Sequence, residues 1–175
     1  DQYHMLIERL ALKVHNSGWA FDQILCLARG GMRPGDVLSR VFDKPLAIMS
    51  TSSYRADAGT IQGRLDIAKY ITLPKGELAG RVLLVDDVIT AGTAIREALG
   101  LVIAQGAIPS GVLIALDRQE RGTGERSAAQ ELASEFNIKV VSIVGLADLI
   151  AFAGQDSTIR GHLASMQAYL DCYGV

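Results

Sequence analysis

The apolar positions of this chain fall into short continuous runs that alternate with stretches of helical spacing. A continuous apolar run of about four to eight residues is typical of a buried strand, whereas apolar residues three and four apart indicate one face of a helix. Because the two patterns alternate, the sequence predicts an α/β fold with a mainly parallel, right-handed, twisted sheet flanked by helices. The strand-like runs cover 23–28, 45–49, 66–73, 81–85, 111–116 and 139–144, and the helical patterns cover 5–14, 34–41, 92–105, 127–136 and two segments near the C-terminus.

Three polar breaks follow predicted strands and lie at 28–35, 86–93 and 117–122. In a parallel sheet the carboxyl ends of the strands meet at one edge, and ligands bind outside that edge. The sequence therefore predicts that the three breaks share one site. The stretch 51–64 is polar, contains glycine and follows neither period, so we interpret it as a mobile loop.

The chemistry of these breaks suits a phosphorylated sugar. Asp86 and Asp87 stand directly before the small and hydroxylated run 90–93, which leads into a helical pattern. Small residues at a helix N-terminus let backbone N–H groups converge on an anion. Carboxylates beside such an anion suit vicinal ribose hydroxyls, or Mg²⁺ held through water. In the break 29–31, an arginine with two glycines offers a guanidinium and a permissive backbone for a second phosphate group.

Length and charge narrow the classes of protein. The chain has 175 residues, which suits a single domain over 1–175. A net charge of -2 and a pI near 5.9 give no electrostatic reason to expect nucleic acid or a membrane surface as a partner. The chain has no Cys/His cluster of zinc spacing and no signal-peptide pattern over 1–10. We expect Cys26 and Cys172 to be free, buried thiols of a protein of the reducing cytoplasm.

The segment "VLLVDDVITAGTA" at 82–94 resembles the phosphoribosyl-diphosphate (PRPP) motif of the type I phosphoribosyltransferases. The resemblance implies that family's fold, with a flexible loop and a reduced hood, and a homodimer. It also implies Mg²⁺-dependent transfer of the 5-phosphoribosyl group from PRPP to a nucleobase, with Mg²⁺ held through PRPP and water near the acidic pair. The implied catalytic residues are Asp86, Asp87 and Arg29.

The resemblance also implies where each part of PRPP binds. Asp86 and Asp87 would hold the ribose hydroxyls, Ala91 to Thr93 would surround the 5′-phosphate, and Ala28 to Gly31 would form the pyrophosphate loop. In that loop the family often has a non-proline cis peptide. The implied PRPP-binding residues are Ala28, Arg29, Gly30, Gly31, Asp86, Asp87, Val88, Ile89, Thr90, Ala91, Gly92 and Thr93, and the implied flexible-loop residues are Ser53, Tyr54, Arg55 and Arg64.

The two halves of the chain resemble different branches of this family. From about Val82, the run "LDRQERGTGE" at 116–125 and the later "DLIAF" are similar to orotate phosphoribosyltransferases, which implies that Arg118 pairs with the orotate carboxylate and Thr90 contacts the pyrimidine. The first half, with "ILCLARGGMRPGDVLSRVF" and "SSYRADAGTIQGRLDIAKY", is more similar to the purine-salvage branch. The leading expectation is pyrimidine biosynthesis from orotate. The alternatives are a purine enzyme, a chimera joined near 81–92, and a non-catalytic PRPP-binding regulator.

Each motif also has a plainer interpretation. The acidic pair is the kind of charge that solvates a strand end, and Arg29 is the kind of charge that lies on any surface. Arg118 has Asp117 and Glu120 as neighbours in the sequence, which is the pattern of an ion-paired helix start over 118–121. Trp19 is expected in the core. His4, His15 and His162 are isolated in the sequence and are expected either to lie on helix surfaces or to be hydrogen-bonded structural residues.

Overall fold

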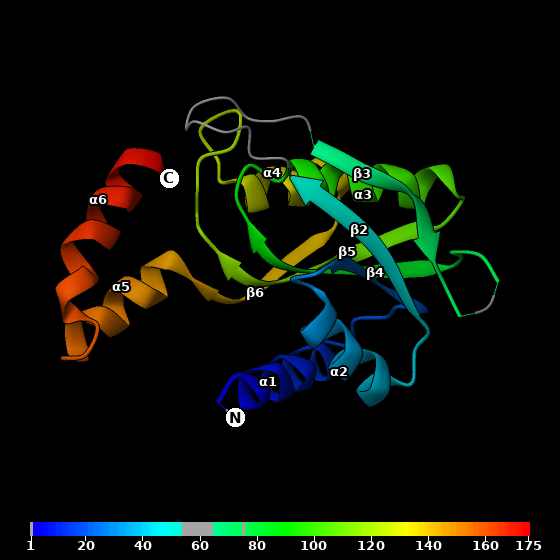
Figure 1. The fold of residues 1–175 in the computed structure, drawn as a ribbon, viewed down its shortest axis with the longest axis horizontal. Helices are drawn as coiled ribbons and strands as arrows, with labels where there is room; N and C mark the ends of the chain where they lie inside the picture. Colours follow the sequence, from blue (N-terminus) through cyan, green and yellow to red (C-terminus); the bar gives the residue numbers. More distant parts are fainter. Residues whose placement is uncertain (1, 54–64, 75) are drawn as a thin grey trace.

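The computed structural model describes residues 2–53, 65–74 and 76–175 and shows a six-stranded sheet with helices on both faces (Figure 1). The strand order is β3-β2-β1-β4-β5-β6, and every neighbouring pair is parallel except β2 with β3. The predicted α/β class is confirmed. The strands are β1 Gln23–Ala28, β2 Leu46–Ser53, β3 Leu65–Thr72, β4 Arg81–Ile89, β5 Ile108–Asp117 and β6 Lys139–Gly145; the helices are α1 Gln2–Asn16, α2 Met32–Phe42, α3 Thr93–Ala104, α4 Ala128–Phe136, α5 Leu146–Gln155, the 3-10 turn η1 Arg160–His162 and α6 Leu163–Tyr173.

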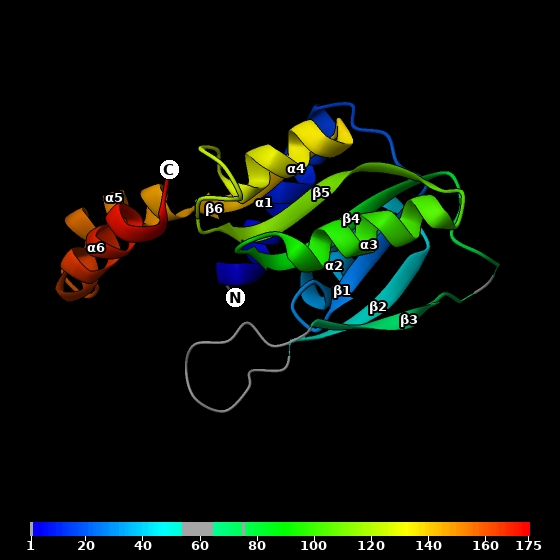
Figure 2. The same ribbon diagram turned by 90° about the horizontal axis from the view of Figure 1, so that it is seen from above.

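The central strands read as continuous apolar runs because both faces of the sheet are covered (Figure 2). In β1, Ile24 and Cys26 pack into a cluster with α1 and α2, whereas Leu25 and Leu27 face a second cluster with α3 and α4. The same alternation divides the apolar residues of β4. Successive strand side chains point to opposite faces, so a strand with two buried faces has no polar positions left.

Strand β4 is longer than the sequence predicted and ends at Ile89 rather than Val85. The extension pairs with β5, with Asp86 opposite Ile114 and Ile89 opposite Asp117. These backbone partners come from β5, and they keep residues 86–89 extended although two of them are acidic. The acidic pair therefore lies within the strand, which corrects the prediction that it follows the strand.

The structure also tests several smaller predictions. Both cysteines are free, but only Cys26 is buried, so the prediction of a buried Cys172 was wrong. Cys172 lies on α6, which the structure describes throughout and which buries none of its residues.

Trp19 is half-buried, packs against the α1–α2 cluster and donates its indole N–H to the Ser110 carbonyl at 3.0 Å. No helix in the described part of the chain is long and apolar enough to cross a membrane.

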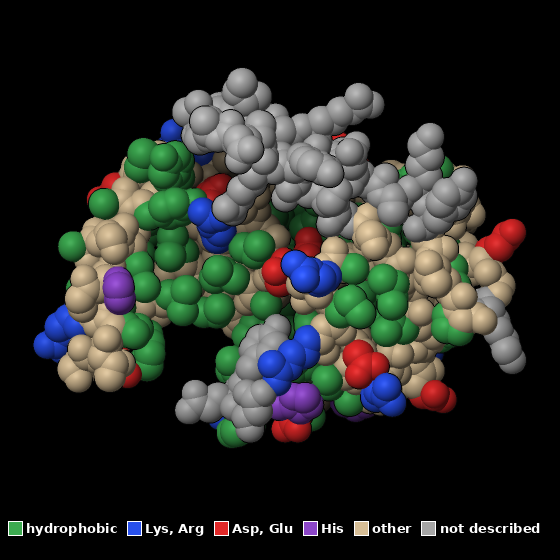
Figure 3. Space-filling view, in the orientation of Figure 1, with side chains coloured by type: hydrophobic (Ala, Val, Ile, Leu, Met, Phe, Trp, Pro, Cys, Tyr) green, Lys and Arg blue, Asp and Glu red, His purple; other side chains and the backbone are tan. Residues whose placement is uncertain are grey.

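The helices α5 and α6 form a pair that extends from the end of β6 away from the sheet (Figures 1 and 2). The chain then returns to the loop after β5, where the Arg121 N–H donates to the Tyr173 carbonyl at 2.7 Å and Glu120 forms a β-bridge with Gly174. In the space-filling view, apolar side chains gather on these helices beside a hollow in that face (Figure 3). The C-terminus is thus attached to one of the predicted site loops.

Candidate active site at the carboxyl edge of the sheet

The loop after β1 lies directly against the acidic pair. The pairing of β1 with β4 ends at Cys26 and Val85, so β4 continues without β1 beside it. The backbone of 29–31 lies in that place: a Cβ added to Gly31 would be 2.1 Å from the Val85 carbonyl oxygen, and one added to Gly30 would be 2.0 Å from Asp87 Cγ. Gly31 has no room for a side chain because the β4 backbone lies there, and a side chain at Gly30 would displace the Asp87 carboxylate.

The peptide bond between Ala28 and Arg29 is cis. This agrees with the non-proline cis peptide that the family resemblance implies for the loop. Arg29 itself is exposed at the edge of the sheet, one residue before the glycines that touch β4.

The two carboxylates differ in their surroundings. Asp86 is half-buried and its Oδ1 accepts the Asp87 N–H at 2.9 Å, whereas Asp87 is exposed and its Oδ1 accepts the Val88 N–H at 2.9 Å. Burial, with a smaller contribution from the neighbouring Asp87 charge, raises the pKa of Asp86 to about 7. A charge at Asp86 is therefore costly in the free protein, unlike the freely solvated strand-end charge of the plainer interpretation. A bound cation or hydroxyl donor would offset that cost.

The loop 90–93 places a glycine at the start of α3. Gly92 is the N-cap, has φ 75° and is buried, while Thr90 and Thr93 on either side are exposed. The positive φ favours glycine at this position. No described side chain caps the start of α3, so the N–H groups of its first turn are open to an anion. The arrangement has the features of the predicted 5′-phosphate site.

The end of β5 brings the predicted base contacts to the same edge. Ile89 of β4 is paired with Asp117 of β5. Thr90 and Arg118, the residues that follow them, are therefore the first residues beyond the ends of these two neighbouring strands. Arg118 Nε lies 2.8 Å from Glu120 Oε1, and the guanidinium lies 5.0 Å from the centre of the Tyr169 ring. It also donates to the Tyr169 hydroxyl, which in turn donates to Glu120. The Arg118–Glu120 ion pair of the plainer interpretation is thus present, but no helix starts within the described residues 118–121, and Arg118 also contacts α6.

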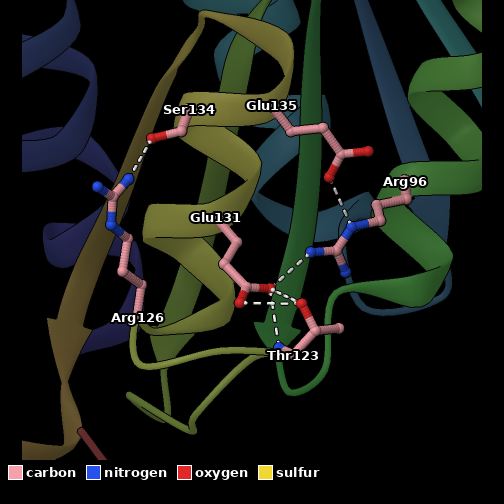
Figure 4. Close-up of a pocket in the computed structure, with 6 residues that line it drawn as sticks. All are labelled: Arg96, Thr123, Arg126, Glu131, Ser134 and Glu135. Atoms are coloured by element: carbon pink, nitrogen blue, oxygen red, sulfur yellow. Dashed lines mark hydrogen bonds and ion pairs between the residues drawn. The ribbon is translucent and has the colours of Figure 1, made fainter.

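Arg96 is a residue that the sequence did not single out. It lies in the first turn of α3, donates from Nη1 to the Ala91 carbonyl at 2.7 Å, and pairs with Glu131 and Glu135 of α4 (Figure 4). Glu131 in turn accepts N–H groups of the loop after β5. Partners this far apart in the sequence produce no local spacing signal, so only the tertiary structure reveals them.

The predicted flexible loop is only partly within the described residues. Residues 51–53, which were predicted to begin the loop, instead extend β2 because they pair with β3, so Ser53 belongs to the strand. Tyr54, Arg55 and Arg64 lie outside the described residues. Among residues 2–53, 65–74 and 76–175, no group of three or more His, Cys, Asp or Glu is placed to hold a metal ion. Two adjacent carboxylates suit Mg²⁺ that takes its other ligands from phosphate oxygens and water.

Comparison with known proteins assigns the family. The sequence model of the family described as "phosphoribosyl transferase domain" matches residues 1–141. A curated orotate phosphoribosyltransferase of Pseudoalteromonas translucida is 59% identical over 104 residues, which are 59% of this chain and 49% of that protein. One of Klebsiella pneumoniae is 56% identical over 98 residues, 56% of this chain and 46% of that protein. The chain spans about half the length of these curated relatives.

Solved structures share the fold. An orotate phosphoribosyltransferase of Francisella tularensis has a TM-score of 0.65 at 24% identity, over 98% of this chain and 79% of that one. An adenine phosphoribosyltransferase of Thermoanaerobacter pseudethanolicus has a TM-score of 0.59 at 18% identity, over 82% of this chain and 80% of that one. At these identities the likeness shows the fold alone, and enzymes for different bases share it.

Proposed function

The chain belongs to the phosphoribosyl transferase domain family, and we propose that it transfers the 5-phosphoribosyl group of PRPP to orotate, giving orotidine 5′-monophosphate and pyrophosphate. The observation that carries the proposal is the packing of the 29–31 backbone against Asp87, on the strand that leads into the open start of α3. Orotate as the base is supported by the two relatives that are 56% and 59% identical over part of this chain.

In this proposal the ribose 5-phosphate moiety lies along the end of β4. Asp86 and Asp87 accept the 2′- and 3′-hydroxyl hydrogens of the ribose, and each charge-assisted bond contributes about 1.5–3 kcal/mol. The N–H groups of the first turn of α3 and the hydroxyl of Thr93 donate to the 5′-phosphate. The sugar is therefore fixed at both ends, which holds C1 in one place for the reaction.

The pyrophosphate group then lies beside the 29–31 loop. The guanidinium of Arg29 and nearby backbone N–H groups donate to its oxygens as the C1–oxygen bond breaks and negative charge passes to the leaving group. Mg²⁺, when bound to these oxygens near Asp86 and Asp87, supplies positive charge to the leaving group. A ring nitrogen of the base forms the new bond to C1 and loses its proton, which passes to the departing pyrophosphate, and the family's transition state is oxocarbenium-like. The carboxylates of β4 lie where the sugar becomes positive.

The base contacts come from Thr90 and Arg118. The planar guanidinium of Arg118 suits the orotate carboxylate, because two parallel N–H···O bonds match the two oxygens. Binding orotate in this way exchanges the Glu120 carboxylate for the carboxylate of the substrate, so the Glu120 pair holds Arg118 ready at the edge of the site.

A purine base is the second candidate. The alignments with the orotate enzymes cover only 56–59% of this chain, which is the observation that keeps the purine enzyme and the hybrid joined near 81–92 in consideration. A PRPP-binding regulator without turnover is the alternative from another class. It would keep the ribose and phosphate contacts and lack transfer to any base.

We also propose that residues 1–175 form one domain that acts as a homodimer in the cytoplasm. The attachment of the C-terminus to the loop after β5 supports a single domain. The pair α5–α6 supports a dimer: Phe152 is 54% exposed and Tyr173 56% exposed on helices that project from the sheet. A second copy covering this face would bury them. Sedimentation velocity at micromolar protein is expected to give twice the chain mass, and a single-chain mass would contradict the dimer.

The experiment that tests the function is an assay of pyrophosphate release with PRPP, Mg²⁺ and one base at a time. Orotate is expected to react, and uracil, adenine, guanine, hypoxanthine and xanthine are expected to react at least about tenfold more slowly, because a charge-assisted bond is worth that factor or more. The Gly30→Ala variant is the control for contaminating activity, since its Cβ would displace the Asp87 carboxylate. Release with a purine alone would favour the second candidate, and PRPP binding without release would favour the regulator.

A further inference from the structure

We propose that Arg96 and Glu131 are a pair of positioning residues that couple the 90–93 loop to the loop after β5. The inference rests on the proposed function for its consequence in catalysis, and its geometry is independent of it. The pair lies between the two loops, on α3 and α4, and faces a cavity of about 510 Å³ (Figure 4).

On the side of the 90–93 loop, Arg96 controls one peptide plane. Its Nη1 donates to the Ala91 carbonyl at 2.7 Å, while its own N–H donates to the Gly92 carbonyl as the first hydrogen bond of α3. The Ala91 carbonyl and the Gly92 N–H belong to one planar unit, so holding the carbonyl also fixes where that N–H points. Gly92 has no side chain to restrict its backbone, and Arg96 therefore supplies that restriction.

On the other side, Glu131 holds the turn after β5. Its Oε2 accepts the Thr123 N–H at 3.0 Å, its Oε1 accepts the Gly124 N–H at 2.8 Å, and the Thr123 hydroxyl donates to the same carboxylate. These backbone donors are the main reason that the pKa of Glu131 is lowered. Gly122 completes the fit, because a Cβ there would be 2.2 Å from Glu131 Oε2.

The link between the two halves is partly buried. Arg96 Nη2 lies 3.1 Å from Glu131 Oε2, and the side chains are 24% and 15% exposed. Glu135, the other carboxylate on Arg96, is 50% exposed. A partly buried pair in which every group has further hydrogen bonds holds one geometry more strongly than a surface pair, so Glu131 is the stronger of the two partners.

Binding of a ligand in the cavity does not explain this network. Its walls carry two carboxylates and two guanidinium groups, and those side chains bond to one another or to the chain: Arg96 to Glu131 and Glu135, and Arg126 to Ser134. Groups already paired in this way have little left to offer a ligand. Positioning of the two flanking loops is the role that uses the Ala91 contact of Arg96, the Thr123 and Gly124 contacts of Glu131 and the ion pair between the two side chains.

Coupling of these loops has a consequence for the reaction. The 90–93 loop is the proposed 5′-phosphate site, and Arg118 lies on the segment that leads into the turn held by Glu131. Binding of a phosphate that orders Gly92 therefore also orders the segment that receives the base. One rigid connection therefore orders the binding sites of both the phosphate and the base.

Hydrogen exchange of the free protein tests the coupling without any ligand. In Arg96→Gln, the amides of Thr123 and Gly124 are expected to exchange at least about threefold faster, although Arg96 touches neither of them. In Glu131→Gln, the amide of Arg96, which donates to the Gly92 carbonyl, is expected to exchange faster for the same reason. Glu135→Gln removes the exposed partner of Arg96 and is the matched control, expected to leave all three amides unchanged.

A second variant guards against a folding defect. Arg96→Lys keeps the charge but cannot hold the Ala91 carbonyl and Glu131 with one planar group, so its Thr123 and Gly124 amides are also expected to exchange faster at an unchanged unfolding temperature. Parent-like exchange of those amides in Arg96→Gln or Arg96→Lys overturns the coupling. Faster exchange spread over the whole of α3 and α4 also overturns it, because it marks general loosening.

Ribose 5-phosphate separates this inference from the proposed function, because the probe has no base and so cannot touch Arg118 through one. Added to the parent, it is expected to slow the exchange of the Thr123 and Gly124 amides, and added to Arg96→Gln it is expected to bind without slowing them. Slowing that is equal in both proteins overturns the coupling. If ribose 5-phosphate binds to neither protein, the proposed phosphate site fails, and the ligand-free exchange still decides the coupling.

Discussion

Replacing Asp86 with asparagine is expected to stabilise the fold at pH 7 and to weaken PRPP binding at least about tenfold. The carboxyl is half-buried and its pKa is raised to about 7, first by burial and then by the Asp87 charge, so its ionised form costs free energy in the folded chain. Asparagine keeps an oxygen that accepts the Asp87 N–H and carries no charge. We expect a gain of about 2 kcal/mol in the free energy of unfolding.

The pH dependence of that gain follows from the direction of the shift. Below the ordinary value of 3.8 the carboxyl is protonated in the folded and in the unfolded chain, and it costs nothing. Between 3.8 and about 7 the unfolded chain is ionised while the folded chain keeps its proton, so the stability of the parent falls as the pH rises. The difference in unfolding temperature between Asp86→Asn and the parent is therefore expected to grow from pH 4 to 7 and then level off.

Differential scanning calorimetry over this pH range and calorimetric titration with PRPP and Mg²⁺ measure the two effects. Asp87→Asn is the matched control: Asp87 is exposed, so the substitution is expected to cost at least about tenfold in PRPP affinity and to stabilise the fold less than Asp86→Asn, because it removes only the smaller contribution of the Asp87 charge to the raised pKa of Asp86. An Asp86→Asn protein that unfolds at the parent temperature at every pH would refute the assignment of a costly buried charge. Unchanged PRPP affinity in both variants would remove the acidic pair from the ribose site.

Replacing Arg118 with alanine is expected to weaken the use of orotate by about tenfold or more while PRPP binding stays near that of the parent. The variant loses a charge-assisted bond to the substrate carboxylate, worth about 1.5–3 kcal/mol. In the free protein the remaining partners still satisfy each other, because the Tyr169 hydroxyl donates to Glu120. The substitution therefore leaves no isolated donor behind.

Steady-state kinetics with saturating PRPP, on orotate and on hypoxanthine, separate the two enzyme candidates. Arg121→Ala is the matched control: it removes a guanidinium from the same segment, where Arg121 donates to the Gly174 carbonyl at 3.1 Å and has no proposed contact with the base. Its orotate KM is expected to stay within about threefold of the parent value. If Arg118→Ala impairs orotate and hypoxanthine equally, Arg118 acts by packing, and the orotate carboxylate has another partner.

The sequence was sufficient to locate the strands, although not all of their ends, and to find the loops that carry the chemistry. Continuous apolar runs mark strands buried on both faces, as in β1, whose predicted bounds are those observed. The local signals of a helix start are also short-range: Ser127 caps α4 by accepting the Gln130 N–H at 3.2 Å, and the prediction began the helix at that residue. Patterns of this kind are local because the backbone bonds and side-chain faces that cause them repeat within a few residues.

The true end of β4 needed the tertiary structure. Two adjacent carboxylates argue against a buried strand in the sequence, so the prediction ended the strand before them. Only the pairing with β5 shows why residues 86–89 stay extended. The contact between Gly30 and Asp87 also depends on where β1 stops pairing with β4. Each of these contacts depends on a strand partner distant in the sequence, which local periodicity does not encode.

The composition of the site therefore came from the sequence, and its connections came from the fold. The residue types and the spacing of Asp86, Asp87 and Gly92 indicate a phosphate and ribose site in the sequence alone. Arg96 and Glu131 are ordinary helix residues in the sequence, separated by 35 positions, and they acquire a role only when α3 and α4 pack side by side on one face of the sheet. Side-chain bonds of this kind form as a consequence of folding. Bringing two distant residues together costs loop-closure entropy, and the burial of the whole core compensates that cost, whereas the pair alone does not.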